Sequence, residues 1–362
     1  MTVSLEKEIS TEKSYTIGLD VIRIIAMFLV IMVHSTSFYG FLAEEINSFT
    51  AVIVGAGRYL SMACVPLFIL LTGYLNLNKK PEFSYYIKLL KILIEFFLSA
   101  AAVALFYSLY LEGGEPFWSM MKRATSFYFP QYSWYIRMYV GLFLLAPFFN
   151  YIIAAITGKQ AILLTVILIL VFSNPFISDY WQTAYPIMYY FIGAIIRKTQ
   201  FNVNKIFSVA IVTVFCFLQV WLLRHPIIST FGVENHNNLA CVLVSVFLFL
   251  LLCDVRCVPS GKLKRALTKT ARVIANASMP TFLISVIFET LTEVLFGKLA
   301  LTTYSQKLPY LLYLTPLKFV LSVIAGIVVS IIATFIFRLI IKAVNATKNI
   351  IRKKLTHSSQ EQ

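Results

Sequence analysis

Three polar residues lie within GLDVIRIIAMFLVIMVHS, an apolar stretch that runs from residue 18 to residue 35. Arg23 and His34 are eleven positions apart. In an α-helix this spacing is three turns plus about 20°, so both side chains share one face. Asp20, three residues before Arg23, falls on the same side. At about 1.5 Å per residue, His34 stands about 17 Å beyond Arg23, which predicts a polar stripe rising through the membrane.

Two kinds of chemistry fit this stripe. A charged group inside a bilayer costs at least ~2.5 kcal/mol, so each one indicates a pathway, a binding site or an ion pair. In one interpretation, Arg23 is an anchor at the inner membrane surface, Asp20 is its neighbour, and His34 lies at the outer interface. In the other, Arg23 binds an anion from the cytoplasm, and His34, which exchanges protons near neutral pH, moves a proton deeper in the membrane.

Two carboxylates toward the opposite membrane face form a second candidate group. Glu289 and Glu293 are one helical turn apart and share a face. The pair either holds a proton or a sugar, or forms ion pairs, and the residue types favour ion pairs. The cations expected in the same leaflet are Arg58, Arg137, Arg224 and Lys318.

Two outer segments carry groups that suit recognition of a polar molecule. The loop GVENHNNLA, residues 232–240, places Glu234 and His236 among asparagines. It either binds a polar molecule or is a solvated turn, and the turn is the simpler account. Trp134 and Tyr135, at an outer helix end, suit an interfacial aromatic belt as well as a sugar-stacking site.

Composition indicates which elements must position these residues. The chain has 362 residues, of which 59% are apolar and 13% charged, whereas soluble domains are about 25% charged. A bilayer core about 30 Å thick requires about 20 apolar residues per helix. The sequence therefore predicts an all-α, polytopic membrane protein with about ten transmembrane helices. The predicted spans are 17–38, 51–75, 86–111, 132–153, 161–178, 183–199, 205–224, 239–254, 273–297 and 310–341.

The distribution of basic residues predicts the orientation of these helices. Of the 31 lysines and arginines, 23 fall on one side of the predicted bundle and eight on the other. By the positive-inside rule, the richer side and both termini are cytoplasmic. The chain then divides into an N-terminal tail, 1–16, a membrane domain, 17–341, and a basic C-terminal tail, 342–362. The formal charge of +15 is thus explained by topology in a lipid bilayer and does not indicate nucleic-acid binding.

The cysteines form neither a disulfide framework nor a metal site. Cys253 and Cys257 are one turn apart, but no companion cysteine or histidine lies near them in the sequence. A structural metal site needs about four such ligands. We interpret all five cysteines as small apolar fillers, and we expect no metal and no permanently bound cofactor.

Several stretches resemble the acyltransferase-3 family of membrane acyltransferases, many of which O-acetylate cell-envelope sugars. Residues 19–34, LDVIRIIAMFLVIMVH, match the family's first-helix pattern LDxxRxxAxxxVxxxH. Residues 66–75, PLFILLTGYL, resemble PxFFxxSGY, with Thr72 in place of serine. Residues 133–148 and 185–197 resemble two later helices of the smaller cell-surface members.

Two stretches depart from the family pattern. Lys88 and Lys91, in KLLK, stand where members often carry two arginines. The change keeps the charge but loses the planar fork that binds phosphate through two hydrogen bonds. TFLIS, residues 281–285, stands where many members have YLIH, so any role of that second histidine cannot be transferred to this chain.

The resemblance implies that the protein lies in a bacterial plasma membrane. It also implies an acyl-CoA co-substrate, most often acetyl-CoA, that enters from the cytoplasmic side. A hydroxyl acceptor, such as an envelope glycan, would approach from the other side. His34 would act as general base on that hydroxyl, a role typically worth about 10²–10⁴ in rate, or would itself carry the acyl group. Asp20 would hold Arg23 in position. The donor would contact Arg23, Lys88, Lys91, Thr72, Gly73 and Tyr74.

A transporter or flippase of an envelope precursor is the alternative function. Ten helices with sparse polar residues suit a carrier, whose halves often show an internal repeat. The two halves of this sequence show no clear repeat, and the spacing of Arg23 and His34 is not a carrier pattern. The residues therefore favour an enzyme, and they do not identify the acceptor or the oligomeric state.

Overall fold

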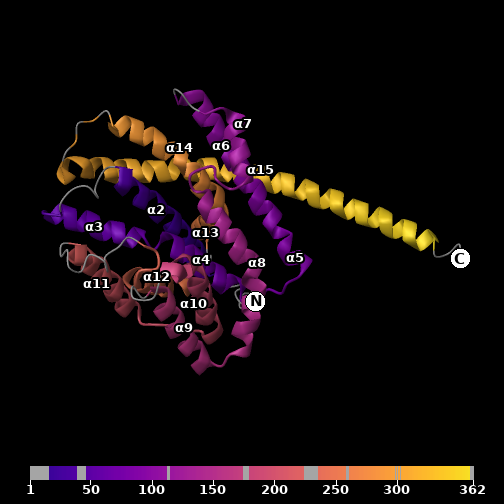
Figure 1. The fold of residues 1–362 in the computed structure, drawn as a ribbon, viewed down its shortest axis with the longest axis horizontal. Coiled ribbons are helices and arrows are strands. Elements are labelled where there is room, and N and C mark those ends of the chain that lie inside the picture. The colour runs from indigo at the N-terminus through magenta and orange to yellow at the C-terminus, as the bar shows by residue number, and fades with distance from the viewer. Residues whose placement is uncertain are drawn as a thin grey trace, which may run out of the picture.

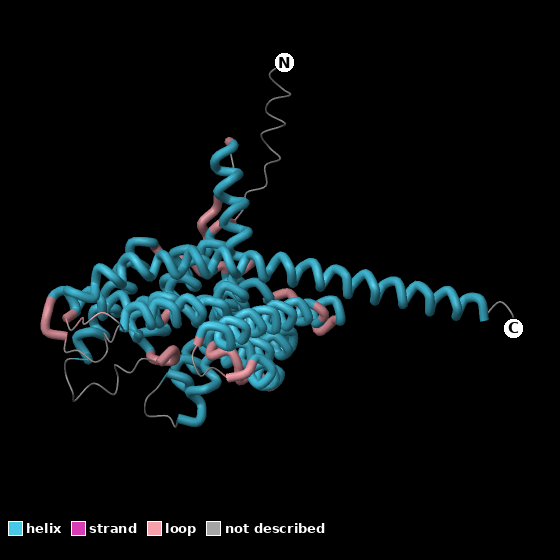
Figure 2. Tube along the Cα trace, turned by 90° about the horizontal axis from the view of Figure 1, so that it is seen from above, coloured by secondary structure: helices cyan, strands magenta, loops and turns pink. Residues whose placement is uncertain are grey.

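The computed structural model describes residues 16–38, 46–111, 115–173, 179–223, 235–257, 261–297, 299, 301 and 303–358. Its regular structure is helical (Figure 2), which confirms the predicted all-α class. The elements are α2 (Gly18–Phe38), α3 (Phe49–Ser61), α4 (Cys64–Asn76), α5 (Phe83–Tyr86), α6 (Lys88–Tyr110), α7 (Phe117–Thr125), α8 (Ser133–Ala155), α9 (Gly158–Ser173), η1 (Asp179–Ala184), α10 (Tyr185–Thr199), α11 (Lys205–Leu223), α12 (Leu239–Cys253), α13 (Lys262–Asn276), α14 (Ser278–Gly297) and α15 (Tyr304–Ser358). Residues 1–15 of the predicted N-terminal tail, together with Arg224 and Glu234, lie outside the described residues.

Seven helical segments of the described chain are long and apolar enough to cross a membrane. They are Gly18–Ser37, Phe49–Asn76, Phe83–Tyr110, Ser133–Ala155, Lys205–Leu223, Ser278–Gly297 and Tyr304–Thr347. The other three predicted spans correspond to the shorter helices α9, α10 and α12, of 16, 15 and 15 residues. The chain is thus a helical membrane protein, while the count of ten spans and the cytoplasmic termini stay predictions.

The C-terminal part of the chain forms one helix of 55 residues, α15. It joins the predicted last span, 310–341, to most of the predicted tail, 342–362. Helix α15 packs along α14, and its C-terminal part extends away from the rest of the molecule in Figures 1 and 2.

The segment 255–272, which connects the predicted spans 239–254 and 273–297, is mostly helical. Helix α13 occupies Lys262–Asn276, and α14 begins at Ser278, so the predicted span 273–297 starts in the last turn of α13. Helix α13 is not among the segments that are long and apolar enough to cross a membrane, so its place between two predicted spans is unchanged. Its alanine, leucine, lysine and arginine residues nevertheless have high helix propensity.

The predicted span 51–75 is two helices with a break at Met62 and Ala63. Pro66 explains the break, because proline has no backbone N–H to donate to the carbonyl four residues earlier, that of Met62. The Met62 carbonyl lies 3.0 Å from Nδ1 of His236 and accepts from Sγ of Cys241. The break therefore ties α3 and α4 to the segment that enters α12.

Pro147 likewise removes one backbone hydrogen bond within α8, although this helix is continuous. It leaves the carbonyl of Phe143 without its helical donor, and the hydroxyl of Tyr85 donates to that carbonyl at 2.9 Å. The rings of Tyr85 and Phe143 stack with centroids 4.3 Å apart. The short helix α5 is thereby fixed to the middle of α8.

Two glycines allow α4 and α10 to pack backbone against backbone. A Cβ on Gly73 would lie 2.0 Å from the carbonyl oxygen of Tyr190, and a Cβ on Gly193 would lie 2.0 Å from that of Leu70. Small residues at helix interfaces are typical of membrane bundles, because they let backbones approach closely. This contact fixes the position of α4, one wall of the cavity described next.

Candidate active site

A cavity of about 230 Å³ lies among α2, α4, α6, α8 and α14. Most of its lining side chains are apolar or aromatic. On α2 the lining includes Arg23 and Val30, which are seven residues, or about 10 Å, apart along the helix. The cavity therefore follows the polar stripe of α2 from Arg23 toward His34.

Arg23 lies at one end of this cavity, paired with Asp20. Its Nη1 donates to Oδ1 of Asp20 at 3.0 Å. Asp20 is buried, whereas the Arg23 side chain is 24% exposed. A guanidinium has five N–H donors, so the bond to Asp20 orients Arg23 and leaves donors for an anion.

His34 lies one helical turn beyond Val30 on α2. Its ring is 4.6 Å, centroid to centroid, from that of Tyr132, the residue that precedes α8. Tyr132 stacks in turn on Phe282 of α14 at 5.1 Å, and Phe282 lines the cavity. The cavity thus reaches Phe282, and Tyr132 lies between Phe282 and His34.

A buried polar cluster surrounds this pair of rings. The hydroxyl of Tyr132 donates to the carboxylate of Glu289, and Oγ of Ser285 donates to the same carboxylate at 3.2 Å. The ammonium of Lys318, on α15, donates to Ser35 and interacts electrostatically with Glu289 and with His34. Lys318 is thus a cation that acts on Glu289 electrostatically, and the ion-pair interpretation stays a prediction.

Arg58 connects α3 to the end of α2 that carries His34. Its Nη1 donates to the carbonyl of Val33 at 2.9 Å, to the hydroxyl of Thr36 at 2.7 Å and to that of Ser37 at 3.0 Å. Arg58 is buried and also interacts electrostatically with His34. It therefore holds the backbone just before the histidine and two side-chain hydroxyls just after it.

The predicted outer residues His236, Trp134 and Tyr135 lie together. The ring of Trp134, 37% exposed, stacks on that of His236 with centroids 6.4 Å apart. Trp134 also contacts Tyr135 edge to face, and Tyr135 lines the cavity. Burial lowers the pKa of His236 to about 4, so this imidazole is neutral at physiological pH. Glu293, by contrast, is exposed and lies one turn beyond the buried Glu289.

The three predicted donor-channel residues of α4 occupy different positions. Thr72 lines the cavity, and its hydroxyl donates to the carbonyl of Phe68 at 2.7 Å. Gly73 faces α10 in the close contact described above. The ring of Tyr74 lies 5.2 Å from the guanidinium of Arg197, which also donates to the Tyr74 carbonyl. Thr72 is thus the member of this group that borders the cavity.

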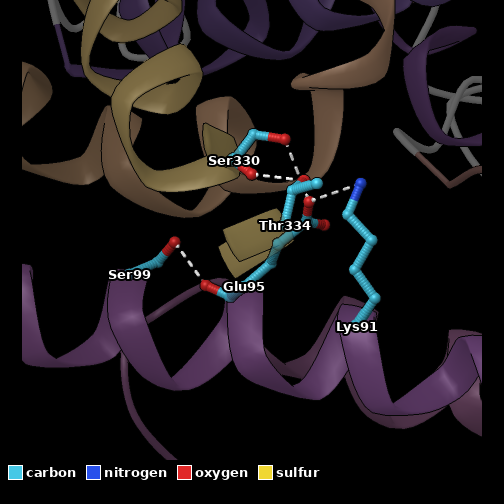
Figure 3. Close-up of polar contacts among 5 residues, drawn as sticks. All are labelled: Lys91, Glu95, Ser99, Ser330 and Thr334. Carbon is cyan, nitrogen blue, oxygen red and sulfur yellow. Dashed lines mark hydrogen bonds and ion pairs between the residues drawn. The ribbon is translucent and has the colours of Figure 1, made fainter. Parts of the chain in front are cut away.

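The two predicted donor-binding lysines lie at the start of α6. Lys88 is exposed, and Nζ of Lys91 pairs with Oε1 of Glu95 at 3.4 Å. Figure 3 shows that this carboxylate also accepts from Ser330 of α15, at 3.1 Å. On α6, the residue that lines the cavity is Ile92. Lys91 is thus held in a contact between α6 and α15, and Lys88 lies outside the cavity.

These features define a class of protein: a helical membrane protein with a cavity between its helices, a cation at one end of the cavity, and a histidine in a polar cluster one helical turn beyond the cavity residue Val30. Residues 16–336, nearly the whole chain, match the family model for the acyltransferase domain of the acyltransferase-3 family. The chain belongs to this family, and it is a membrane acyltransferase. No curated protein and no solved structure matches the chain.

Proposed function

We propose that the protein transfers an acetyl group from cytoplasmic acetyl-CoA to a hydroxyl of an envelope glycan or a related cell-surface acceptor, with His34 as general base. The observation that carries this proposal is the cavity that runs from Arg23 to within one helical turn of His34. A guanidinium at one end suits a phosphate. An imidazole at the other end suits removal of a proton.

The size of the cavity supports a thioester arm as the part of the donor that enters. At about 230 Å³ it is smaller than the about 300–1,000 Å³ typical of pockets for drug-sized ligands. The acetyl thioester end of the pantetheine chain is the part of the donor that would enter such a space, while the nucleotide of CoA stays outside. Arg23 is placed to bind the phosphates where the arm enters, and Thr72 borders the arm.

The reaction follows from this placement. His34 accepts the proton of the acceptor hydroxyl, and the oxygen attacks the thioester carbonyl carbon. The bond between this carbon and sulfur breaks, and the proton passes from the imidazole to the departing thiolate, giving CoA and an acetyl ester. Tyr132 packs on the imidazole ring, and Arg58 holds the carbonyl of Val33, the residue before His34. Such positioning is itself a large part of catalysis.

The aromatic group of Trp134, Tyr135 and His236 supports a sugar-like acceptor. Trp134 is partly exposed and presents a ring face next to His236. His236 also interacts electrostatically with His34, so an acceptor on Trp134 is close to the proposed base. Aromatic faces with adjacent polar groups are suited to binding ligands that have one apolar and one polar face.

Transfer of label from radiolabelled acetyl-CoA tests the proposal. Vesicles that contain the protein are expected to incorporate label into lipid-linked or polysaccharide material, and cells that contain the protein should show acetyl-sized masses on their envelope polysaccharides. Mass spectrometry of cells without the protein is the control. A transporter would leave the label on CoA and the polysaccharide masses unchanged.

Two variants test the role of His34. H34A should abolish transfer, and H34Q, which keeps a similar shape but cannot accept the proton, should lose it to the same extent. Size-exclusion profiles in detergent should be unchanged for both. A folded H34Q that keeps a substantial fraction of wild-type activity would remove His34 as the base.

A further inference from the structure

Helix α13 has three distinct sides. Thr268 and Ala275, seven residues apart, are buried and therefore mark the side against the protein. Leu263 and Leu267, on a second side, are 73% and 59% exposed. A third side carries a row of exposed cations at spacings of three, four and three residues, which places them along one line of a helix. These cations are Lys262, Arg265, Lys269 and Arg272.

The exposed leucines are unusual for a helix that is otherwise so polar. Helix α13 contains five lysines and arginines and no acidic residue. It is therefore not a transmembrane span. Its charge alone would favour a position in water, but the apolar second side favours contact with lipid. A helix with a strongly basic face and a separate apolar face lies in the plane of the membrane surface, with the apolar face about 5–10 Å deep.

The position of α13 in the bundle agrees with such a location. It packs against α2, α14 and α15. The backbone N–H of Gly18, at the start of α2, donates to the carbonyl of Val255, shortly before α13. Ser278 and Met279, directly after α13, line the cavity. Helix α13 thus lies at the Arg23 end of the bundle, where α2 begins.

We propose that α13 is an interfacial helix that binds an anionic phospholipid surface. Leu263 and Leu267 insert among the upper parts of the acyl chains, and the row of cations contacts the phosphate headgroups. Charge complementarity favours this partner, because each lysine or arginine near an anionic leaflet adds to the attraction. The apolar side distinguishes a lipid surface from a soluble phosphate compound, which would contact the cations only. Headgroup binding then holds α13, and with it Ser278 and Met279, at the mouth of the cavity.

Fluorescent labels on two sides of α13 test this placement in the full-length protein. The cysteines are buried except Cys257, so a C257S background allows labelling of L267C or, as the matched control, K269C. The proteins are reconstituted in vesicles of phosphatidylcholine with phosphatidylglycerol. The label at position 267 should be quenched several-fold more by nitroxide-labelled lipid than by iodide, and the label at 269 should show the reverse. Equal quenching of both labels by iodide would place α13 in water and overturn the proposal.

The anionic part of the proposal has its own measurement. Native mass spectrometry of the protein released from mixed vesicles should show retained phosphatidylglycerol in preference to phosphatidylcholine. The variant K262Q/R265Q/K269Q, which removes three cations of the row, should lose most of that preference. K79Q/K80Q/K159Q removes the same charge from exposed positions elsewhere and should keep it. An equal loss in both variants would show that total charge, and not α13, selects the lipid.

If free CoA displaces the bound lipid from wild type but not from the α13 variant, α13 is a CoA site and the proposal is wrong. None of these measurements depends on acyl transfer.

Discussion

The rings of His34 and Tyr132 lie 4.6 Å apart, with an angle of 30° between their planes. This contact joins the first transmembrane helix to the start of α8. The hydroxyl of the same tyrosine donates to the buried carboxylate of Glu289. One side chain therefore connects the proposed base to the polar cluster of α14 and α15.

Y132F should separate these two contacts. It keeps the ring against His34 but removes the donor to Glu289, and a buried carboxylate that loses a hydrogen bond costs about 1–3 kcal/mol. We expect a lower melting temperature in detergent and a partial loss of transfer, whereas Y132A should lose transfer almost completely because His34 also loses its packing partner. Equal activity in wild type and Y132A would show that the contact does not position the base.

R23A should weaken donor binding more than it slows the chemical step. Hydrogen bonds to charged groups contribute about 1.5–3 kcal/mol, so KM for acetyl-CoA should rise about 10- to 100-fold with a smaller change in kcat. R23K keeps the charge without the fork and should fall between wild type and R23A. A fall in kcat at unchanged KM would contradict a role of Arg23 in donor binding.

G73A should destabilise the protein, because the new Cβ would lie 2.0 Å from the Tyr190 carbonyl oxygen. Overpacking of this kind typically costs about 1–3 kcal/mol. G141A in α8 is the matched control: a Cβ there meets nothing within 4 Å, and the glycine-to-alanine change should gain up to about 1 kcal/mol of helix stability. Thermal unfolding measures both. If G73A raised KM for the donor and left the melting temperature unchanged, Gly73 would face the donor and not α10.

Acidic pH should destabilise the protein partly through His236. Burial lowers the pKa of this imidazole from 6.5 to about 4. Between these values the unfolded chain binds a proton that the folded chain does not, so stability falls as pH is lowered from 6.5 toward 4. H236Q removes the proton uptake on unfolding. Between pH 6.5 and 4, its melting temperature should therefore decline less than that of wild type. Identical declines would show that His236 does not contribute.

The helices and the polar stripe of α2 could be predicted from local patterns. Apolar runs of span length identify α2, α6, α8, α11 and α14, and the period of 3.6 residues places Arg23 and His34 on one face. The family match and the cavity that follows this stripe agree with the resemblance found in residues 19–34.

The partners of His34 could not be predicted in the same way. Tyr132 precedes α8 and meets His34 only because α2 and α8 are brought together by packing between distant parts of the chain. Lys318 comes from α15 and reaches Ser35 across 283 positions. Neither contact leaves a local pattern. The pair of Lys91 and Glu95, in contrast, has the spacing of four residues that marks helical ion pairs, and that signal was available in the sequence.

The break between α3 and α4 also has a consequence for the order of assembly. Pro66 leaves the Met62 carbonyl to be completed by His236 and Cys241, and His236 lies 174 positions further along the chain. During synthesis, α3 and α4 can enter the bilayer as one broken span long before these partners exist. The Met62 carbonyl therefore gains these partners only when the segment that leads into α12 arrives, whereas in P66A the backbone N–H of residue 66 could donate to it at once.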